Sequence, residues 1–485
     1  MRRLSPTRTV SRSASGLLFP RGKESSPPME KMHYHMVGIG GTGMSGLARI
    51  LKAEGNVVTG SEITLTEITR ALEGEGIPVA CPQTGRNIPK KCDMVVCSAA
   101  VPKTNLEYKA AKRRRIAIRK YPEVVGEVMS GKSGIAFCGT HGKTSSAALA
   151  SHTFAISGCD PTFLVGGDLV AYETNSRVGS GRHFIVEACE YQRSFLNLSP
   201  EAVVITNVEA DHLDYYRNLD DIIAAFGAFA GKVPKKGLLV VNAADANAKE
   251  AIKGARAEVQ TIGLCAKADW NARIVTSSPG RTRFEIRYRG RGLGVADLGL
   301  IGEHNVLNAL GVAAVAHWAG LRSAEILHGM STFRGVKRRF EVISGSLPVT
   351  VIDDYAHHPT EISKAIAAAR LMFPDKEIWA LFQPHQYSRT RFFLDEFAEV
   401  LAAADYVVIP NIYDVRDPAS ERKKVGPRDL VERIRKCGGR AEYTAGFAAA
   451  LNLLEDELTP ECALITMGAG DVNAVAYEYC RRLAG

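Results

Sequence analysis

The chain of 485 residues is 46% hydrophobic and 23% charged, which is the composition of an ordinary globular protein with more than one domain. No apolar run reaches the roughly 18 residues of a membrane-spanning helix, so we expect no membrane partner. The net charge of +9 suggests nucleic acid as a partner, but no basic patch is interleaved with aromatic residues, and we expect no nucleic-acid binding.

Much of the positive charge lies at the N-terminus. Residues 1–23 contain six basic side chains, several serines and no acidic side chain, and Met29 and Met32 offer a later start just before the first predicted strand. Such a segment is typical of a disordered tail or a transit-like sequence. We therefore expect residues 1–32 to be a disordered extension or a misassigned start. The remaining chain is mildly basic, which suits an enzyme with anionic substrates.

The ten cysteines form no C-x-x-C pair and show no zinc-like spacing with histidine. Cys97, Cys138 and Cys189 lie inside apolar runs. This distribution predicts reduced thiols in the core of a cytoplasmic protein.

Short apolar runs recur along the chain, each ending in Gly, Asn or Asp and followed by a helical pattern. This alternation predicts parallel sheets covered by helices on both faces, which is a doubly wound α/β architecture with ligands at the carboxyl ends of the strands. Turn-rich joints at 129–134 and 331–348 divide the chain into three predicted domains, 33–132, 133–335 and 336–485. The apolar runs are 35–41, 93–100, 134–142, 183–190, 201–212, 237–247, 349–359, 378–385, 406–414 and 463–472. Residues 283–302 alternate between apolar and polar side chains, which predicts a β-hairpin in the middle domain.

The first predicted strand ends in the glycine cluster "GIGGTGMSG". Gly38, Gly40, Gly41 and Gly43 follow a strand and open a helix, a position where backbone N–H groups can approach a phosphate. Two alternatives remain open. One is a tight turn without a ligand, and the other is NAD binding, with Glu62 on a ribose.

A second glycine loop, "GTHGKT" at 139–144, follows the strand that begins the middle domain. The standard phosphate-binding loop has the pattern G-x-x-x-x-G-K-[ST], yet the position of its first glycine is Phe137. The strand and helix on either side argue against a chance match. Lys143 is placed to reach the β- and γ-phosphates of a nucleotide, and the Thr144 hydroxyl is placed to bind Mg²⁺.

Acidic side chains follow two further strands of the middle domain, where a magnesium site belongs. Glu187 and Glu190 follow one strand. The other is followed by Asn207, Glu209, Asp211, His212 and Asp214. An alternative for Asp211 and Asp214 is helix capping. His304 and Asn305 open a later helix, either as contacts to a nucleotide base or as caps.

Histidines and arginines cluster in the last third of the chain. Such arginines commonly offset the negative charge of a phosphoryl transfer, although Lys337 is as well explained by a solvated surface. A metal site at the tandem His357 and His358 is the less favoured alternative, because adjacent ligands converge poorly. The cluster comprises Lys337, Arg338, Arg339, Asp353, Asp354, His357, His358, His385, Arg389 and Arg391.

In this order, these motifs resemble the Mur ligase family over nearly the whole chain after Met32. The most specific segments are "GIGGTGMSG", "GTHGKT", "EACEYQRSFL", "TNVEADHLDYY", "EHNVLNAL", "FRGVKRRFE", "DDYAHHPTE" and "QPHQYSRTR". The family uses a short G-T-x-G-K-T loop, which accounts for the missing glycine. The resemblance implies a Rossmann-like N-terminal domain, a central P-loop ATPase domain with a parallel sheet, and a Rossmann-like C-terminal domain.

The chemistry implied by the resemblance is ATP-dependent amide bond formation in peptidoglycan precursor synthesis. UDP-N-acetylmuramate would be activated as an acyl phosphate and then attacked by L-alanine, with ATP and Mg²⁺ as cofactors and the enzyme a cytoplasmic monomer or homodimer. Three rivals stay open: a sister ligase of cell-wall recycling that adds a peptide, a non-catalytic P-loop nucleotide switch, and an NAD-dependent oxidoreductase.

The resemblance also assigns roles to individual residues. Catalytic roles fall to Lys143, His212, His357 and Arg389. Metal ligation falls to Thr144, Glu187 and His212, with Glu190 as an alternative to Glu187. ATP contacts fall to Gly139, Thr140, His141, Gly142, Lys143, Thr144, Ser145, His304, Asn305, Arg339 and Asp354. Substrate contacts fall to Gly38, Gly40, Gly41, Thr42, Gly43, Met44, Ser45, Ser98, His385 and Arg391.

Overall fold

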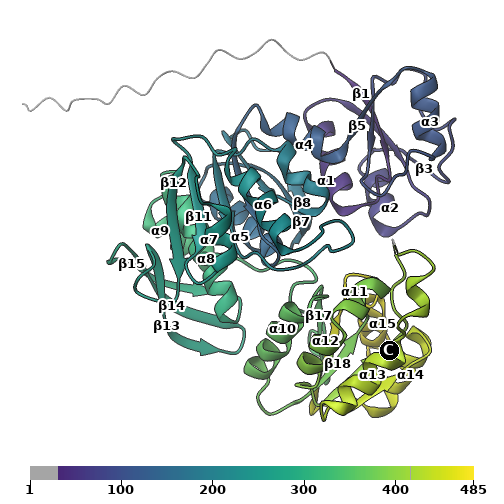
Figure 1. Cartoon of the computed structure of the whole chain (residues 1–485), viewed down its shortest axis with the longest axis vertical. Helices are drawn as coiled ribbons and strands as arrows, with labels where there is room; N and C mark the ends of the chain where they lie inside the picture. The colour runs from purple at the N-terminus through teal and green to yellow at the C-terminus, as the bar shows by residue number, and fades with distance from the viewer. Residues whose placement is uncertain (1–30, 416, 485) are drawn as a thin grey trace, which may run out of the picture.

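The computed structural model describes residues 31–415 and 417–484, so the extension predicted for residues 1–32 lies outside the described residues except at 31 and 32. Three sheets follow one another along the chain, each flanked by helices (Figure 1). The α/β class predicted from the alternating runs is confirmed. Among the described residues, no helix combines the length and hydropathy needed to cross a bilayer.

The N-terminal sheet has five parallel strands in the order β3-β2-β1-β4-β5, so the chain reverses direction across the sheet at β1. Its strands are β1 (His33–Val37), β2 (Val57–Ser61), β3 (Val79–Ala80), β4 (Met94–Cys97) and β5 (Ala117–Lys120). Its helices are α1 (Thr42–Ala53), α2 (Glu67–Gly74), α3 (Leu106–Arg113) and α4 (Tyr121–Met129). A ligand site is expected beside such a reversal, at the carboxyl end of β1.

The central sheet has ten strands in the order β15-β14-β13-β12-β11-β10-β6-β9-β7-β8. Its strands are β6 (Ser133–Cys138), β7 (Thr162–Leu169), β8 (Thr174–Arg177), β9 (His183–Glu187), β10 (Ala202–Ile205), β11 (Leu238–Asn242), β12 (Glu258–Gly263), β13 (Trp270–Ser278), β14 (Arg281–Tyr288) and β15 (Arg291–Leu298). Its helices are α5 (Lys143–Ile156), α6 (Leu219–Ala230), α7 (Ala246–Ala251), α8 (Glu303–Trp318) and α9 (Ser323–Thr332), with the 3₁₀ helix η1 (Tyr191–Asn197).

Antiparallel strands extend the parallel centre of this sheet at both edges. The predicted hairpin is confirmed, because β14 pairs with β15 in antiparallel register from Thr282 opposite Leu298 to Tyr288 opposite Arg291. The antiparallel pair of β7 and β8 at the other edge was not predicted. Helices α5 and α8 are buried on nearly all sides, and their small residues let them lie close to the sheet.

The C-terminal sheet has six strands in the order β16-β17-β21-β18-β19-β20, all parallel except β16. Its strands are β16 (Glu341–Val342), β17 (Thr350–Asp354), β18 (Glu377–Phe382), β19 (Tyr406–Ile409), β20 (Ala441–Tyr443) and β21 (Cys462–Met467). Its helices are α10 (Pro359–Met372), α11 (Tyr387–Phe392), α12 (Leu394–Leu401), α13 (Pro427–Lys436), α14 (Phe447–Glu457) and α15 (Asn473–Leu483), with the 3₁₀ helix η2 (Glu421–Lys423).

The N-terminal unit packs tightly on the central sheet. Helix α1 lies against β7 and β8, and a Cβ built on Gly46 would come within 2.5 Å of a Leu164 methyl group. The Asn175 amide donates to the Thr42 carbonyl over 2.8 Å at the same contact. One apolar core runs from Met36 in β1 to Phe226 in α6, whereas the buried cores around β17–β21 contain only C-terminal residues. The first two units therefore share a core that the third does not enter.

All ten cysteines are free thiols, as predicted. Cys97 and Cys138 are buried in strands, but Cys81, Cys189, Cys265 and Cys437 are exposed, so the assignment of the thiols to the core was wrong for these four. Cys189 lies two residues after Glu187, the last residue of β9, where the chain leaves the sheet.

Candidate active site

A short glycine loop joins β6 to α5. Gly139 and Gly142 have φ values of 135° and 80°, in the left-handed region that favours glycine. A Cβ on Gly139 would lie 2.0 Å from the Thr206 hydroxyl oxygen, so no other residue fits there. Phe137 is a buried residue of β6, outside the turn. The position where the standard pattern has its first glycine is therefore part of β6, and the turn does not require a glycine there.

Lys143, the first residue of α5, has its ammonium group turned back over the loop. Its Nζ donates to the carbonyls of Gly139 and Thr140 over 2.6 and 3.0 Å and to Glu190 Oε1 over 3.0 Å. Burial alone would lower the pKa of Lys143, but the charge of Glu190 outweighs it and raises that pKa above its ordinary value. The result is a charged lysine held by two loop carbonyls and a buried carboxylate.

The two glutamates after β9 have different surroundings. Burial would raise the pKa of Glu190, but Lys143 and His212 lower it, with His212 Nε2 lying 3.6 Å from Glu190 Oε1. Glu190 Oε2 is buried without a hydrogen-bond partner among the described residues. Glu187 instead accepts from the Gly166 N–H over 2.7 Å and lines a separate cavity of about 210 Å³ with Gly43. Glu190 is therefore the glutamate that lies beside the lysine and the histidine.

A larger cavity of about 470 Å³ opens beside the loop. His304 and Asn305 line it from the first turn of α8, and burial lowers the pKa of His304 to about 4. The alternative that they cap this helix was wrong, because the N-cap is Gly302. The predicted ATP contacts that line the cavity are His141, Gly142, Thr144, Ser145, His304, Asn305, Arg339 and Asp354.

The C-terminal unit supplies one wall of this cavity. Arg339 Nη2 donates to the Thr144 hydroxyl over 3.1 Å, and its guanidinium lies over the Tyr355 ring, 4.9 Å from the centroid. Asp354 accepts from the N–H groups of Phe340 and Ala356, both over 2.7 Å, and burial raises its pKa to about 6. Asp354 thus holds the turn that carries Arg339. Lys337 is exposed, in line with a solvated surface.

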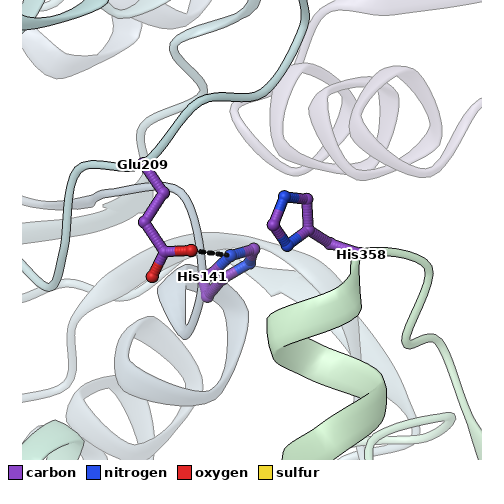
Figure 2. Close-up of side chains that lie close together, drawn as sticks. All are labelled: His141, Glu209 and His358. Carbon is purple, nitrogen blue, oxygen red and sulfur yellow. Dashed lines mark ion pairs between the residues drawn. The ribbon is translucent and has the colours of Figure 1, made fainter. Parts of the chain in front are cut away.

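His141 connects the loop to the C-terminal unit. Figure 2 shows its ring between Glu209, which follows β10, and His358, the N-cap of α10. Its Nε2 lies 3.4 Å from Glu209 Oε2, and its Nδ1 lies 3.0 Å from Glu361 Oε1. Burial would lower the pKa of His141, but the two carboxylates raise it to about 9. In turn, the hydrogen bond from His141 lowers the pKa of Glu209 to about 2.

The same group has the composition of a metal site. Ligand atoms of His141, Glu209 and His358 lie within 4.8 Å of one another, and zinc commonly takes two histidines and a carboxylate. Several of these atoms are already engaged, however: His358 Nδ1 accepts from the Thr360 N–H, Glu209 Oε2 accepts from the Thr360 hydroxyl over 2.8 Å, and His141 Nε2 is ion-paired with Glu209. Among the described residues, Nε2 of His358 has no hydrogen-bond partner. We therefore interpret the group as an ion-paired contact between the central and C-terminal units.

A second contact between the same units lies near His212. Arg389 Nη2 donates to Asp211 Oδ1 over 2.6 Å, and both side chains are less than a tenth exposed. Burial would raise the pKa of Asp211, but the positive groups around it lower it. Arg389 Nη1 also lies 3.2 Å from His385 Nδ1. The capping alternatives for Asp211 and Asp214 were wrong, because Asn218 caps α6.

His357 lies between the two contacts. Its backbone N–H donates to Glu361 Oε2 over 3.0 Å, and its Nδ1 lies 3.1 Å from the Tyr355 carbonyl oxygen. Burial lowers the pKa of His357 to about 4, so the ring is neutral, with its proton on Nδ1 and its Nε2 lone pair available. Arg391 points elsewhere: its Nε donates to Glu421 in η2, and the side chain is 48% exposed.

The first glycine loop, after β1, is surrounded by different side chains from those around the phosphate loop. Gly38 has a φ of 76°, and a Cβ on it would lie 3.1 Å from the Ser98 Cβ, so the predicted neighbour after β4 does lie beside the loop. The Gly40 N–H donates to Glu62 Oε2 over 2.9 Å. Gly43 lies against Tyr121, whose hydroxyl oxygen would be 2.7 Å from an added Cβ. The helix that follows contains the other predicted contacts, Thr42, Met44 and Ser45.

Two partners in the site, Thr360 and Glu361, were not predicted from the sequence, and Asp211 was predicted only as a metal ligand or a cap. Each lies within three positions of a predicted residue, since 211 precedes His212 and 360–361 follow the tandem histidines. Their proximity was the one available signal, but the contacts that they make cross between units far apart in the chain.

The sequence matches three family profiles in chain order: "Mur ligase family, catalytic domain" over residues 33–133, "Mur ligase middle domain" over 138–316 and "Mur ligase, glutamate ligase domain" over 338–470. It is 40% identical over 447 residues to a UDP-N-acetylmuramate--L-alanine ligase of Caldanaerobacter subterraneus subsp. tengcongensis, covering 92% of this chain and 96% of that protein.

Two solved structures resemble the whole fold. The UDP-N-acetylmuramate-alanine ligase of Thermotoga maritima superposes with a TM-score of 0.81 at 28% identity, covering 93% of this chain and 99% of that one. A murein peptide ligase of Psychrobacter arcticus has a TM-score of 0.72 at 23% identity, covering 94% and 99% of the two chains, and shares the fold.

Proposed function

This chain belongs to the Mur ligase family, and we propose that it joins L-alanine to the lactyl carboxylate of UDP-N-acetylmuramate in an ATP-dependent reaction of peptidoglycan precursor synthesis. The observation that supports this most directly is the cavity of about 470 Å³ that the phosphate loop shares with α8 and Arg339. Its lining combines Gly142, Thr144 and Ser145 of the phosphate loop with His304 and Asn305 of α8 and with Arg339 of the C-terminal unit. Lys143, which lies between Gly142 and Thr144 in the sequence, is not among the lining residues.

In the first step, a carboxylate oxygen of UDP-N-acetylmuramate attacks the γ-phosphorus of ATP, the bond to the β-γ bridging oxygen breaks, and ADP leaves. Negative charge develops on the transferring group, so fixed positive charge beside it lowers the barrier. Lys143 is the group that meets this need, because its ammonium is held by loop carbonyls and Glu190 at the N-terminus of α5. We assign Arg339 to the same phosphates and Thr140 and Ser145 to the loop that cradles them.

The donors near Lys143 are of the kind that magnesium takes. One Glu190 oxygen is buried without a hydrogen-bond partner among the described residues, the His212 ring lies 3.6 Å from the other Glu190 oxygen, and Thr144 follows Lys143 in the loop. Mg²⁺ prefers oxygen ligands, and when bound it would neutralise phosphate charge. We favour Glu190 over Glu187 as the carboxylate ligand, because Glu187 is hydrogen-bonded to Gly166 at the edge of another cavity.

In the second step, the amine of L-alanine attacks the acyl carbon, the bond to the phosphate oxygen breaks, and phosphate and one proton are released. We propose that L-alanine is held for this attack by His357, His385 and Arg389. A guanidinium fits the carboxylate of the amino acid, and the neutral His357 ring offers Nε2 as a hydrogen-bond acceptor for the amine. The buried partner Asp211 holds Arg389 in place.

The N-terminal unit is proposed to bind the uridine diphosphate at the glycine loop from Gly38 to Ser45 and at Ser98. The backbone N–H groups at the start of α1 favour a diphosphate. For Arg391 to contact the substrate, its ion pair with Glu421 would have to break. We propose domain limits of 33–132, 133–335 and 336–485, and a monomer or homodimer in the cytoplasm, a reducing compartment that suits ten free thiols.

The test is phosphate release from ATP and Mg²⁺ with UDP-N-acetylmuramate present and each acceptor added singly. We expect L-alanine to drive release and Lys143→Ala to abolish it. Release with a peptide alone would assign the chain to the recycling ligase, and no release with any acceptor would leave the nucleotide switch as the better explanation.

A further inference from the structure

We propose that Glu361 is a positioning residue that couples the occupancy of the ATP site to that of the amino-acid site. The proposal rests on the proposed function and goes beyond it by assigning the connection between the two half-reactions to one carboxylate. Glu361 lies in the first turn of α10, and its side chain is 16% exposed.

The first observation is that the two carboxylate oxygens of Glu361 contact different sites. Oε1 lies 3.0 Å from Nδ1 of His141, a residue of the phosphate loop in the central unit. Oε2 accepts from the His357 N–H over 3.0 Å and lies 3.3 Å from His357 Nδ1. A single rigid group therefore spans the loop that binds phosphates and the residue assigned to the incoming amine.

The second observation is that each end of this bridge is itself fixed. The His141 backbone N–H donates to the Asn207 side chain over 2.9 Å, so movement of the ring moves the glycine loop. On the other side, Nδ1 of His357 lies 3.1 Å from the Tyr355 carbonyl oxygen. The Tyr355 ring in turn lies under the guanidinium of Arg339, which donates to Thr144. The bridge has little freedom to absorb a displacement at either end.

The consequence is a linkage between ligands. When a triphosphate enters the loop and displaces His141, the rigid bridge through Glu361 displaces the His357 backbone and ring with it. An amine that binds at His357 then meets a ring that the nucleotide has already positioned. By reciprocity, L-alanine must tighten the binding of the nucleotide by the same factor. This arrangement favours amine binding when the phosphorylating nucleotide is in place.

The neighbouring Thr360 provides a matched comparison. Its hydroxyl donates to Glu209 across the same boundary, but it does not reach His357. Thr360→Val thus removes a contact between the units without cutting the bridge. We expect Thr360→Val to weaken nucleotide binding and to keep the effect of L-alanine, whereas Glu361→Gln removes the effect of L-alanine itself.

The experiment is isothermal titration of the full chain with adenylyl imidodiphosphate and Mg²⁺, in the presence of UDP-N-acetylmuramate, with and without saturating L-alanine. For the wild type we expect L-alanine to lower the Kd of the analogue by at least about 5-fold, the lower end of measured couplings. For Glu361→Gln we expect the two Kd values to agree within about 2-fold. Glu399→Gln, on the exposed side of α12, should behave as the wild type.

A second variant separates bridging from charge alone. Glu361→Asp keeps the charge but is one methylene shorter, so it cannot reach both partners, and we expect it to lose the effect of L-alanine as well. It also provides a test if Glu361→Gln does not fold, which a thermal melt would reveal. Full coupling in Glu361→Asp or Glu361→Gln overturns the proposal, as does a wild type whose nucleotide binding ignores L-alanine. Turnover of the wild type with L-alanine is measured separately, so failure of the proposed function is recognised independently.

Discussion

The two glycine loops begin from the same local structure and differ in what surrounds them. Each follows a strand inside its sheet and opens a helix, β1 to α1 and β6 to α5. At the second loop, Lys143 is buried in an ion pair and His141 lies between two carboxylates. At the first, the opening turn of α1 is Thr-Gly-Met-Ser, and a carboxylate, Glu62, accepts from the Gly40 N–H.

The different surroundings of the two loops suit two different functions, binding of a diphosphate and transfer of a phosphoryl group. Backbone N–H groups at a helix N-terminus are sufficient to hold a diphosphate that stays intact. Transfer of a phosphoryl group requires fixed positive charge where negative charge develops. The first loop is therefore suited to binding the diphosphate of the substrate, and the second loop is suited to the phosphoryl group that is transferred. Four substitutions test this division.

The largest effect is expected from Lys143→Ala. Removing the ammonium takes positive charge from the transfer step and leaves Glu190 buried without its cation. We expect phosphate release to fall by at least about 10³-fold, the magnitude found when a charge-stabilising group is removed from a transfer site. Lys236→Ala, on the exposed surface of the same unit, serves as the control. A loss below about 10-fold would place the phosphoryl group elsewhere.

The next effect concerns stability and pH. The pKa of His141 is raised to about 9 from an ordinary value of 6.5. Because the folded value is the higher one, its contribution to stability is complete below about pH 6.5 and is lost as pH rises through about 9, on the order of 1–3 kcal/mol. The melting temperatures of the wild type and His141→Gln should therefore converge between pH 6.5 and 9.5. Ser45→Ala at the first loop should show a difference that does not change with pH, and a constant gap for His141→Gln would contradict the charged ring.

At the first loop, Gly43→Ala forces an added Cβ against the Tyr121 hydroxyl. Overpacking of this kind costs about 1–3 kcal/mol, so we expect the KM for UDP-N-acetylmuramate to rise about 10-fold. The KM for ATP should not change, because the proposed nucleotide site is at the other loop. Adding Tyr121→Phe removes the hydroxyl and should recover part of the loss. An equal rise in both KM values would mean that the loops are not independent.

The smallest effect is expected from Glu62→Gln. Neutralising a partly exposed carboxylate beside the proposed diphosphate site removes a repulsion worth less than about 1 kcal/mol, so the KM for UDP-N-acetylmuramate should fall by about 2- to 3-fold. The opposite sign is informative. A rise in KM would mean that Glu62 accepts a hydrogen bond from a ribose hydroxyl, which is the role that it would have in a nicotinamide dinucleotide site.

The fold was largely predictable because its signals are local. The apolar runs that end in glycine or polar residues placed most strands, and the alternation over 283–302 placed the hairpin. The glycine loop was recognisable because Gly139, Gly142 and Lys143 must lie close together in sequence. The antiparallel pair of β7 and β8 was missed, since neither strand has a regular alternating pattern.

The contacts across the site were less predictable. His141 and Glu361 are 220 positions apart, and Asp211 and Arg389 are 178 apart. Nothing in the local sequence indicates that these pairs meet, because the meeting depends on how two units pack. The exposure of Cys189 was missed for a related reason: an apolar run predicts a strand but does not show where the strand leaves the core.

The shared apolar core of the first two units has a consequence for how water and salt act on the molecule. Parting those units would expose Leu164 and the apolar face of α1 that packs on it, at a cost that rises with the apolar area exposed. The contacts described between the central and C-terminal units are hydrogen bonds and ion pairs. Dissolved ions weaken such pairs where they are partly exposed, as at Glu209, and much less where they are buried, as at Arg389 and Asp211. Raising the salt concentration should therefore leave the packing between the first two units unchanged and weaken the partly exposed pairs between the central and C-terminal units, such as His141 with Glu209.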